Sequence, residues 1–183
     1  RVERYAIEPL PKDAVVDGNI ANLEVVTDTI DKCLKRLGSK TKFVAMALPS
    51  AAVITKKITL PAGLRETDME VQVESEANQY IPFALEEVNL DFQVIGPSPA
   101  SPDDVDVLLA ASRKEKVEDR VAAAEAADLK PVVMDVESYA TQAAYELIVA
   151  QLPAGAKEQI ITLADIGGAA IKFTMMKGDE LLY

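Results

Sequence analysis

The sequence predicts an α/β fold in which helices flank a mixed sheet. Segments with the pattern of a strand alternate along the chain with amphipathic segments that have the period of a helix. Several strand segments are continuous apolar runs, which is typical of strands buried on both faces. The chain has 183 residues, of which 49% are apolar and 27% charged, so it is long and apolar enough to bury a substantial core.

The first two elements are a strand and a helix. Residues 1–8 alternate between apolar and polar side chains, which predicts a strand that runs into a proline-containing loop. Apolar residues then recur at three- and four-residue steps over 20–37, as on one side of an amphipathic helix. Asp17 or Asn19 is available to cap this helix, and Gly38 is placed to end it.

Two strands, a helix and a third strand follow. The apolar run 43–48 predicts a buried strand, and 52–60 predicts a second strand that ends at a Pro-Ala-Gly turn. Thr67 and Glu70 have the spacing of a capping box, so a helix is expected to begin there and to stop before a proline. Residues 88–95 alternate as a half-buried strand does.

The rest of the chain repeats this alternation of strands and helices. Strand patterns are separated by alanine-rich helical patterns, and the last strands flank a glycine pair and a Lys-Gly-Asp-Glu turn. The predicted strands are 105–111, 131–136, 159–165 and 170–176, and the predicted helices are 116–127 and 138–152. Strand patterns stand at both ends of the chain, so we expect it to be part of a larger protein.

The composition excludes several classes of function. The formal net charge is −11, so the chain is expected to repel the phosphates of nucleic acids and anionic lipids. There is no histidine, which rules out His-based triads and removes the commonest zinc ligand. The single cysteine, Cys33, cannot form an internal disulfide and is expected in the core, which fits a reducing compartment. No stretch has the length and hydropathy of a membrane span, so direct insertion is not expected.

One segment has the pattern of a phosphate-binding loop. Asp165 ends a predicted strand, and two glycines, Gly167 and Gly168, follow it closely. Glycines let a phosphate approach the backbone amides, and the carboxylate can hold a magnesium-bound water. The same residues fit a plain β-hairpin in which the glycines form the bend. The motif alone leaves both interpretations open.

The residues upstream favour the phosphate interpretation. A strand leads through Glu137 into an alanine-rich helix, and the next strand ends at Asp165. This order of strand, acidic residue, helix, strand and Asp-x-Gly-Gly resembles the centre of the actin superfamily, in which the helix joins two lobes. The resemblance implies that Glu137 orients an attacking water. The alternative for Glu137 is a solvated acid at a helix N-terminus, where the helix dipole favours it.

Longer phrases resemble the PilM family of type IV pilus assembly proteins, which is similar in layout to the division protein FtsA. They cover essentially the whole chain, in order and without large gaps. The phrases are 1–11, 60–64, 76–82, 85–92, 105–114 and 133–140.

This resemblance implies a partial actin-like ATPase fold with an FtsA-like inserted subdomain. The first lobe would occupy 1–50 and 105–151, and the small inserted α+β subdomain would occupy 51–104. Residues 152–183 would be the truncated start of the second lobe. The superfamily's first phosphate loop would precede this chain, and its adenine-binding segments would follow it.

The same resemblance implies that the full-length protein binds ATP and Mg²⁺. Asp165 would position Mg²⁺ through a bound water, while Gly167 and Gly168 would let the phosphates approach. Where the superfamily loop ends in Gly-Thr, this sequence has Ala169 and Ala170, so a hydroxyl contact to phosphate is lost. We therefore expect this fragment to bind no nucleotide by itself and the full-length protein to be at most a slow ATPase.

The resemblance also implies a cytoplasmic adaptor at the inner membrane that holds the short N-terminal tail of the membrane protein PilN in a groove. Other pilus assembly proteins and a second copy of the chain are further expected partners. The acidic helix over 66–76 would border that groove, although its simplest interpretation is a solvated face. Two other functions stay open: a catalytic actin-fold ATPase or sugar-kinase relative, and the cytoplasmic domain of a type II secretion L-type protein.

Overall fold

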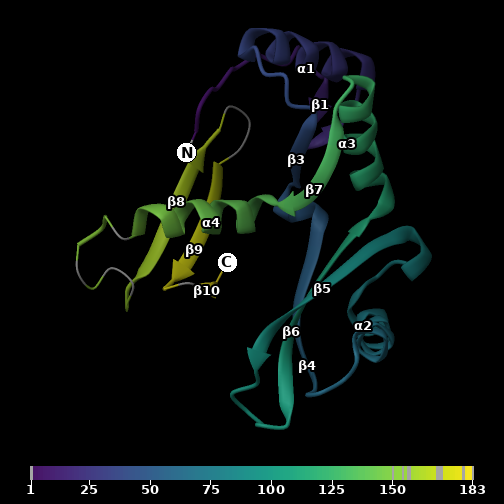
Figure 1. The fold of residues 1–183 in the computed structure, drawn as a ribbon, viewed down its shortest axis with the longest axis vertical. Helices are drawn as coiled ribbons and strands as arrows, with labels where there is room; N and C mark the ends of the chain where they lie inside the picture. The colour runs from purple at the N-terminus through teal and green to yellow at the C-terminus, as the bar shows by residue number, and fades with distance from the viewer. Residues whose placement is uncertain are drawn as a thin grey trace. The chain divides into compact units, whose positions relative to one another are not determined.

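The computed structural model describes residues 2–149, 151–153, 155, 158–167, 171–178 and 180–182, which form parts of two compact units (Figure 1). The first unit spans residues 1–134 and the second spans residues 135–183. The elements of the first unit are β1 (Val15–Val16), β2 (Asn19–Ile20), α1 (Leu23–Leu37), β3 (Phe43–Leu48), β4 (Val53–Pro61), α2 (Glu66–Tyr80), β5 (Val88–Pro97), β6 (Asp104–Arg113), α3 (Lys114–Ala126) and β7 (Lys130–Val136), the last of which crosses the boundary. The second unit contains α4 (Glu137–Val149), β8 (Ile160–Ile166), β9 (Ile171–Lys177) and β10 (Glu180–Leu181).

The predicted class is confirmed, because the described residues form a mixed α/β structure with helices packed on sheets. Strands β3 and β7 are neighbours that run in the same direction (Figure 1). The strand predicted over 43–48 is observed with the same bounds. Leu48 is buried, but Phe43 at the start of β3 is 62% exposed and its ring lies against the Lys130 ammonium. The apolar run is therefore not buried along its whole length within the described part of the chain.

Helix α1 begins later than the apolar stripe predicted. Its N-cap is Asn22, whose Oδ1 accepts the amide of Val25 at 3.1 Å, so the predicted caps Asp17 and Asn19 are wrong. Both belong to the small β1–β2 hairpin, which takes them out of reach of the free amides of the helix. Gly38 ends the helix as predicted, in the left-handed conformation with φ 64°.

A three-stranded antiparallel sheet in the order β4-β6-β5 forms the largest core. Strand β6 pairs with β4 from Val53 to Pro61 and with β5 from Val88 to Pro97. Val107 and Leu109 on β6 are fully buried. β6 begins where the predicted insert ends, yet it pairs along its whole length with strands of that insert. The lobe boundaries inferred from the family resemblance stay a prediction.

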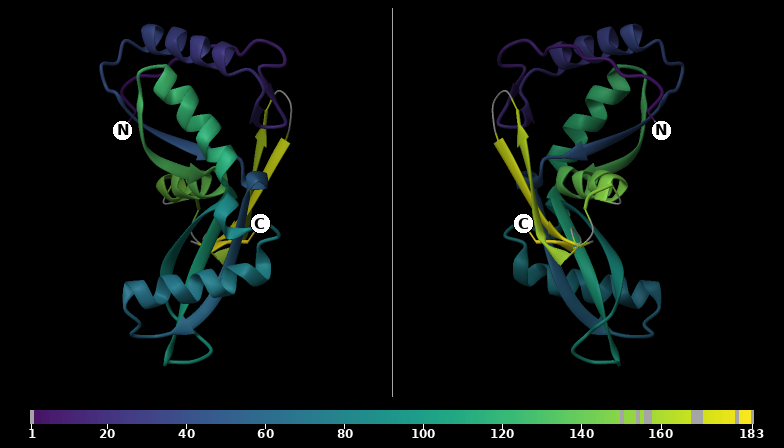
Figure 2. Two further views of the ribbon diagram at one scale, coloured as in Figure 1. Left: turned by 90° about the vertical axis from the view of Figure 1, so that its right-hand side faces the viewer. Right: turned by 90° about the vertical axis from the view of Figure 1, so that its left-hand side faces the viewer.

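Helix α2 covers one face of this sheet (Figure 2). Met69, Val73 and Ala77 recur at four-residue steps and are buried against the strands. The predicted capping box is wrong, because α2 begins at Glu66 and Thr67 already lies within the helix. The residue at the cap position is Arg65, which makes no side-chain cap.

The strand predicted at the start of the chain does not form. Residues 2–10 pair with no strand in the described part of the chain, and alternation alone cannot supply the backbone partners that a strand needs. The segment is instead held to α1. Arg36 donates to the Ile7 carbonyl at 2.7 Å, Cys33 Sγ lies 3.6 Å from the Ala6 carbonyl, and Arg4 donates to the Gly38 carbonyl at 2.9 Å.

The second unit is an antiparallel sheet in the order β10-β9-β8 with α4 packed on it. Tyr145 and Val149 on α4 bury Met176 on β9. These elements confirm the predicted helix over 138–152 and the predicted strands over 159–165 and 170–176 to within a few residues. No helix among the described residues is both long and apolar enough to cross a bilayer.

Candidate phosphate-binding site

Of the predicted loop residues, Asp165 and Gly167 are described, and they lie at one end of the β8–β9 hairpin. Asp165 is the second-last residue of β8, and it stands directly opposite Lys172 on β9. Gly167 follows the strand and is exposed. Gly168, Ala169 and Ala170 lie outside the described residues. The predicted approach of a phosphate to Gly168 therefore stays a prediction. The hairpin itself is compatible with both interpretations of the motif.

Asp165 and Lys172 share the face of the hairpin that carries α4. Residues directly opposite in an antiparallel pair have side chains on the same face, and every second residue along a strand returns to it. Leu163 and Met176 are on this face and pack with α4. Counting in steps of two from these positions places Asp165 and Lys172 there as well. Their backbones are thus set by strand pairing and not by a free loop.

Glu137, the predicted catalytic acid, lies next to Lys172. The ammonium of Lys172 donates to Glu137 Oε2 at 2.6 Å, and the two side chains are 53% and 35% exposed. Thr141 donates its hydroxyl to the Glu137 carbonyl at 2.8 Å, which holds the first turn of α4. Glu137, Lys172 and Asp165 are therefore brought together within the second unit. The helix-dipole interpretation of Glu137 also holds, since it is the first residue of α4.

Lys172 is the site residue that the sequence reasoning missed. A signal was available, because the hairpin bend at the glycines implies that residues equally far from the bend face each other. Counting outward from the Ile166–Ile171 pair gives Asp165 opposite Lys172. The pairing of Lys172 with Glu137 could not be counted in this way, since it depends on how α4 packs on β9.

The residues present fit a hydrated magnesium ion that is held mainly by phosphate oxygens. Carboxylate oxygen is the ligand type that Mg²⁺ prefers, and the ion usually keeps several waters when few protein groups bind it. Asp165 is exposed and offers such a carboxylate. Within the described ranges there is no group of three or more acidic, cysteine or histidine side chains that could hold a metal by themselves. A magnesium ion here would depend on the nucleotide for its other ligands.

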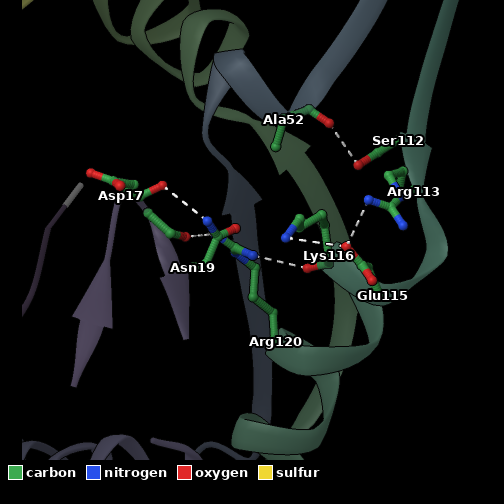
Figure 3. A network of polar contacts seen from close by, with 9 residues as sticks. Asp17, Asn19, Ala52, Ser112, Arg113, Glu115, Lys116 and Arg120 are labelled. Carbon is green, nitrogen blue, oxygen red and sulfur yellow. Dashed lines mark hydrogen bonds and ion pairs between the residues drawn. The ribbon is translucent and has the colours of Figure 1, made fainter. Parts of the chain in front are cut away.

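A second polar cluster lies where β6 passes into α3 in the first unit (Figure 3). Strand β6 ends at Arg113, and the guanidinium of Arg113 lies over the Phe83 ring and bonds Glu115 at 3.2 Å. Glu115 also accepts the ammonium of Lys116 at 3.3 Å. Ser112 donates its hydroxyl to the Ala52 carbonyl at 2.8 Å, which ties the end of β6 to the start of β4.

Arg120 extends this cluster towards the β1–β2 hairpin. It donates to the Gly18 carbonyl at 2.7 Å and to the Lys116 carbonyl at 2.9 Å (Figure 3). Because β6 belongs to the three-stranded sheet and β1–β2 packs near α1 and α3, the cluster braces the sheet against the helices. Through its contacts with Ala52 and Phe83, this junction joins the segment that the family resemblance assigns to the first lobe, 105–151, to the segment assigned to the insert, 51–104.

The outer side of α2 is acidic. Its buried side carries apolar residues, while Glu66, Glu70 and Glu74 are exposed. At the two ends of the helix the charges change, because Arg65 pairs with Asp68 at 2.8 Å and the Lys56 ammonium lies over the Tyr80 ring. The outer side of α2 is therefore compatible with both interpretations of the sequence, a solvated helix face and the rim of a groove.

Comparison with known proteins identifies the family. The family model described as type IV pilus assembly protein PilM matches residues 1–183. A solved structure described as a PilM-PilN type IV pilus biogenesis complex is similar with a TM-score of 0.77 and 30% identity, over 96% of this chain and 51% of that chain. The cytoplasmic domain of EpsL, an inner-membrane component of the type II secretion system of Vibrio cholerae, is similar with a TM-score of 0.55 and 13% identity, over 90% of this chain and 57% of that chain.

The fold and the PilM match define a protein of the actin-like class. At 13% identity, the EpsL domain supports the likeness of fold alone. The chain belongs to the PilM family of type IV pilus assembly proteins, as the resemblance along its sequence predicted. It spans about half the length of the PilM chain that it matches, 51%.

Proposed function

We propose that the full-length protein is a cytoplasmic adaptor of the type IV pilus inner-membrane complex that binds the N-terminal tail of a PilN-like membrane protein. The observation that carries this proposal is the 30% identity, over 96% of this chain, to a structure described as a PilM-PilN complex. The acidic character of the chain, with a net charge of −11, disfavours the alternative of direct adsorption to an anionic membrane. Attachment to the membrane would then come through the partner.

The acidic side of α2 supports a specific mode of recognition. A short tail next to a membrane span often carries basic residues, because positively charged segments are retained on the cytoplasmic side. Exposed Glu66, Glu70 and Glu74 would attract such a tail and orient it. The apolar part of a bound segment would need an apolar surface nearby, and the half-exposed Tyr80 and Phe83 at the end of α2 offer one.

The nucleotide part of the proposal concerns the second unit. Asp165 would hold Mg²⁺ through water, and the backbone at Gly167 and Gly168 would approach the phosphates of ATP. A bound Mg-ATP would supply a polyphosphate and a divalent cation to this end of the hairpin. Glu137 is paired with Lys172 at 2.6 Å. Such a pair suits an acid that orients neighbouring groups better than one that acts as a general base. We therefore propose a site that is occupied by ATP and turns it over slowly at most.

The test is a titration of the full-length protein with a synthetic peptide that has the sequence of the PilN-like partner's N-terminal tail. We expect saturable binding with and without Mg-ATP, and no binding of a peptide with the same composition in scrambled order. Failure to bind in both nucleotide states would contradict the adaptor proposal. ATP turnover that survives Asp165→Ala would exclude this hairpin as the catalytic site.

A further inference from the structure

The end of the β8–β9 hairpin carries the cation Lys172, which is paired with Glu137 and lies at the position opposite Asp165. Lys172 bonds Glu137 at 2.6 Å on one side and faces Asp165 across the β8–β9 pair on the other. A lysine ammonium has three N–H donors, of which the bond to Glu137 uses one. The Lys172 side chain is 53% exposed, so solvent or a ligand can reach it. The Asp165 carboxylate makes no hydrogen bond or ion pair with any described residue.

The residues that precede β9 in the sequence, 168–170, carry no side-chain donor for a phosphate. Ala169 and Ala170 have no hydroxyl, so within that stretch only backbone amides could bond a phosphate oxygen. A polyphosphate is strongly anionic, and it would enter a protein whose net charge is −11. The described part of the second unit contains one other cation, Lys177. It stands at the opposite end of β9, across from Ile160.

We propose that Lys172 binds the phosphate chain of the nucleotide and replaces the hydroxyl that the loop has lost. This inference rests on the nucleotide binding proposed above. The carboxylate of Glu137 acts as a positioning group, because its bond to the ammonium orients Lys172 before the ligand arrives. The surface ion pair by itself would contribute little to stability, since exposed pairs are worth about 0–1 kcal/mol.

The experiment measures the affinity of the full-length protein for Mg-ATP and for AMP by calorimetry or by competition with a fluorescent nucleotide. Charge-assisted hydrogen bonds are among the stronger ones, so Lys172→Met should weaken Mg-ATP binding about tenfold or more. AMP lacks the outer phosphates, and its affinity should change less than about twofold. Lys172→Arg should keep most of the Mg-ATP affinity, because the cation stays. Lys177→Met is the matched control on the same strand and should bind as the wild type does.

Glu137→Gln separates phosphate binding from a purely structural pair. It breaks the ion pair but keeps the ammonium, so it should weaken Mg-ATP binding clearly less than Lys172→Met does. Equal losses in the two variants, or an equal loss for AMP, would assign Lys172 a bracing role and overturn the inference. Wild-type affinity in Lys172→Met would overturn it while leaving the proposed function intact. No Mg-ATP binding by the wild type would overturn this inference together with the nucleotide part of the proposed function.

Discussion

Single residues fix the two ends of α1. The Asn22 side chain accepts the Val25 amide at the start of the helix, and the left-handed Gly38 lets its own amide bond the Leu34 carbonyl at the end. A Cβ built on Gly38 would lie 3.3 Å from Arg4 Nη1, so the residue also leaves room for the guanidinium that holds the start of the chain. Both ends therefore depend on residue types that few substitutions can replace.

Replacing the cap should weaken the first unit. In Asn22→Ala the amide that the side chain accepted is left without its partner, and we expect the free energy of unfolding to fall by about 1 kcal/mol. Asn19→Ala is the matched control, because the bond that its side chain makes among the described residues, to the Asp17 carbonyl at 3.3 Å, stays within the hairpin. Urea denaturation followed by far-UV circular dichroism measures both. A larger loss for Asn19→Ala would mean that the helix is capped from the hairpin, as the sequence pattern predicted.

The sequence pattern alone determines neither the N-cap of α1 nor the partner of Lys172. Asp17, Asn19 and Asn22 are all good caps before one apolar stripe, and which one lies at the helix start depends on the β1–β2 hairpin that takes up the first two. Gly38 was predicted because a left-handed residue is needed there and glycine meets that need at no steric cost. Local spacing picks out Asp165 and Gly167, and their role in binding stays a prediction. The role of Lys172 depends on α4, which spacing does not describe.

At the scale of elements, β6 organises the first unit. It is the central strand of the three-stranded sheet, and its inward residues meet α2. The strand over 105–111, which has both a local pattern and burial, was predicted well, and the strand over 43–48 was predicted with its observed bounds although only Leu48 is buried. The strand over 1–8 was wrong because its alternation had no neighbouring strand to pair with in the described part of the chain. A pattern fixes which side chains share a face, but pairing requires a partner.

The outer face of β6 carries the buried Asp106, which makes the stability of this sheet depend on pH. Its carboxylate bonds Lys57 and the Thr59 hydroxyl, each at 3.1 Å. The hydrogen bond from Lys57 holds the pKa of Asp106 below its usual range, burial opposes this, and the hydroxyls of Ser98 and Thr59 lower the pKa further. The unfolded chain therefore takes up the proton first as the pH falls. The stabilisation is complete above about pH 4 and is lost as the pH falls through the lower pKa of the folded state.

Asp106→Asn should remove this pH dependence. We expect the wild type to be more stable than the variant at neutral pH and the difference to shrink in acid, because a protonated Asp106 resembles the amide. Denaturant unfolding at several pH values between about 2.5 and 7 measures the difference. Asp103→Asn, at an exposed position close by in the sequence, should show no such change with pH. A difference that stays constant from neutral pH to acid would contradict the assigned role of the Lys57–Asp106 pair.

At the scale of the whole molecule, the two proposed roles belong to different units. The acidic helix α2, proposed to attract the partner, lies in the first unit, while Asp165, Glu137 and Lys172 lie in the second. The fold class and the family could be predicted because the family phrases run along the whole chain. The partner surface could not be assigned to particular residues from the sequence, since a surface is assembled from segments that only the fold brings together.

If the roles are separate, each can be removed without the other. In the full-length protein, the charge reversals Glu70→Lys and Glu74→Lys should lower the affinity for the PilN-like peptide about tenfold at low salt. The effect should be smaller at high salt, because the charges are screened. Mg-ATP affinity should be unchanged. Asp165→Ala should lower the affinity for Mg-ATP and leave the affinity for the peptide, measured in the absence of nucleotide, unchanged. Glu118→Lys with Glu125→Lys makes the same change of net charge on exposed positions of α3. If that control lowers the affinity for the peptide as much as the α2 variant does, the overall charge of the protein and not the surface of α2 attracts the tail.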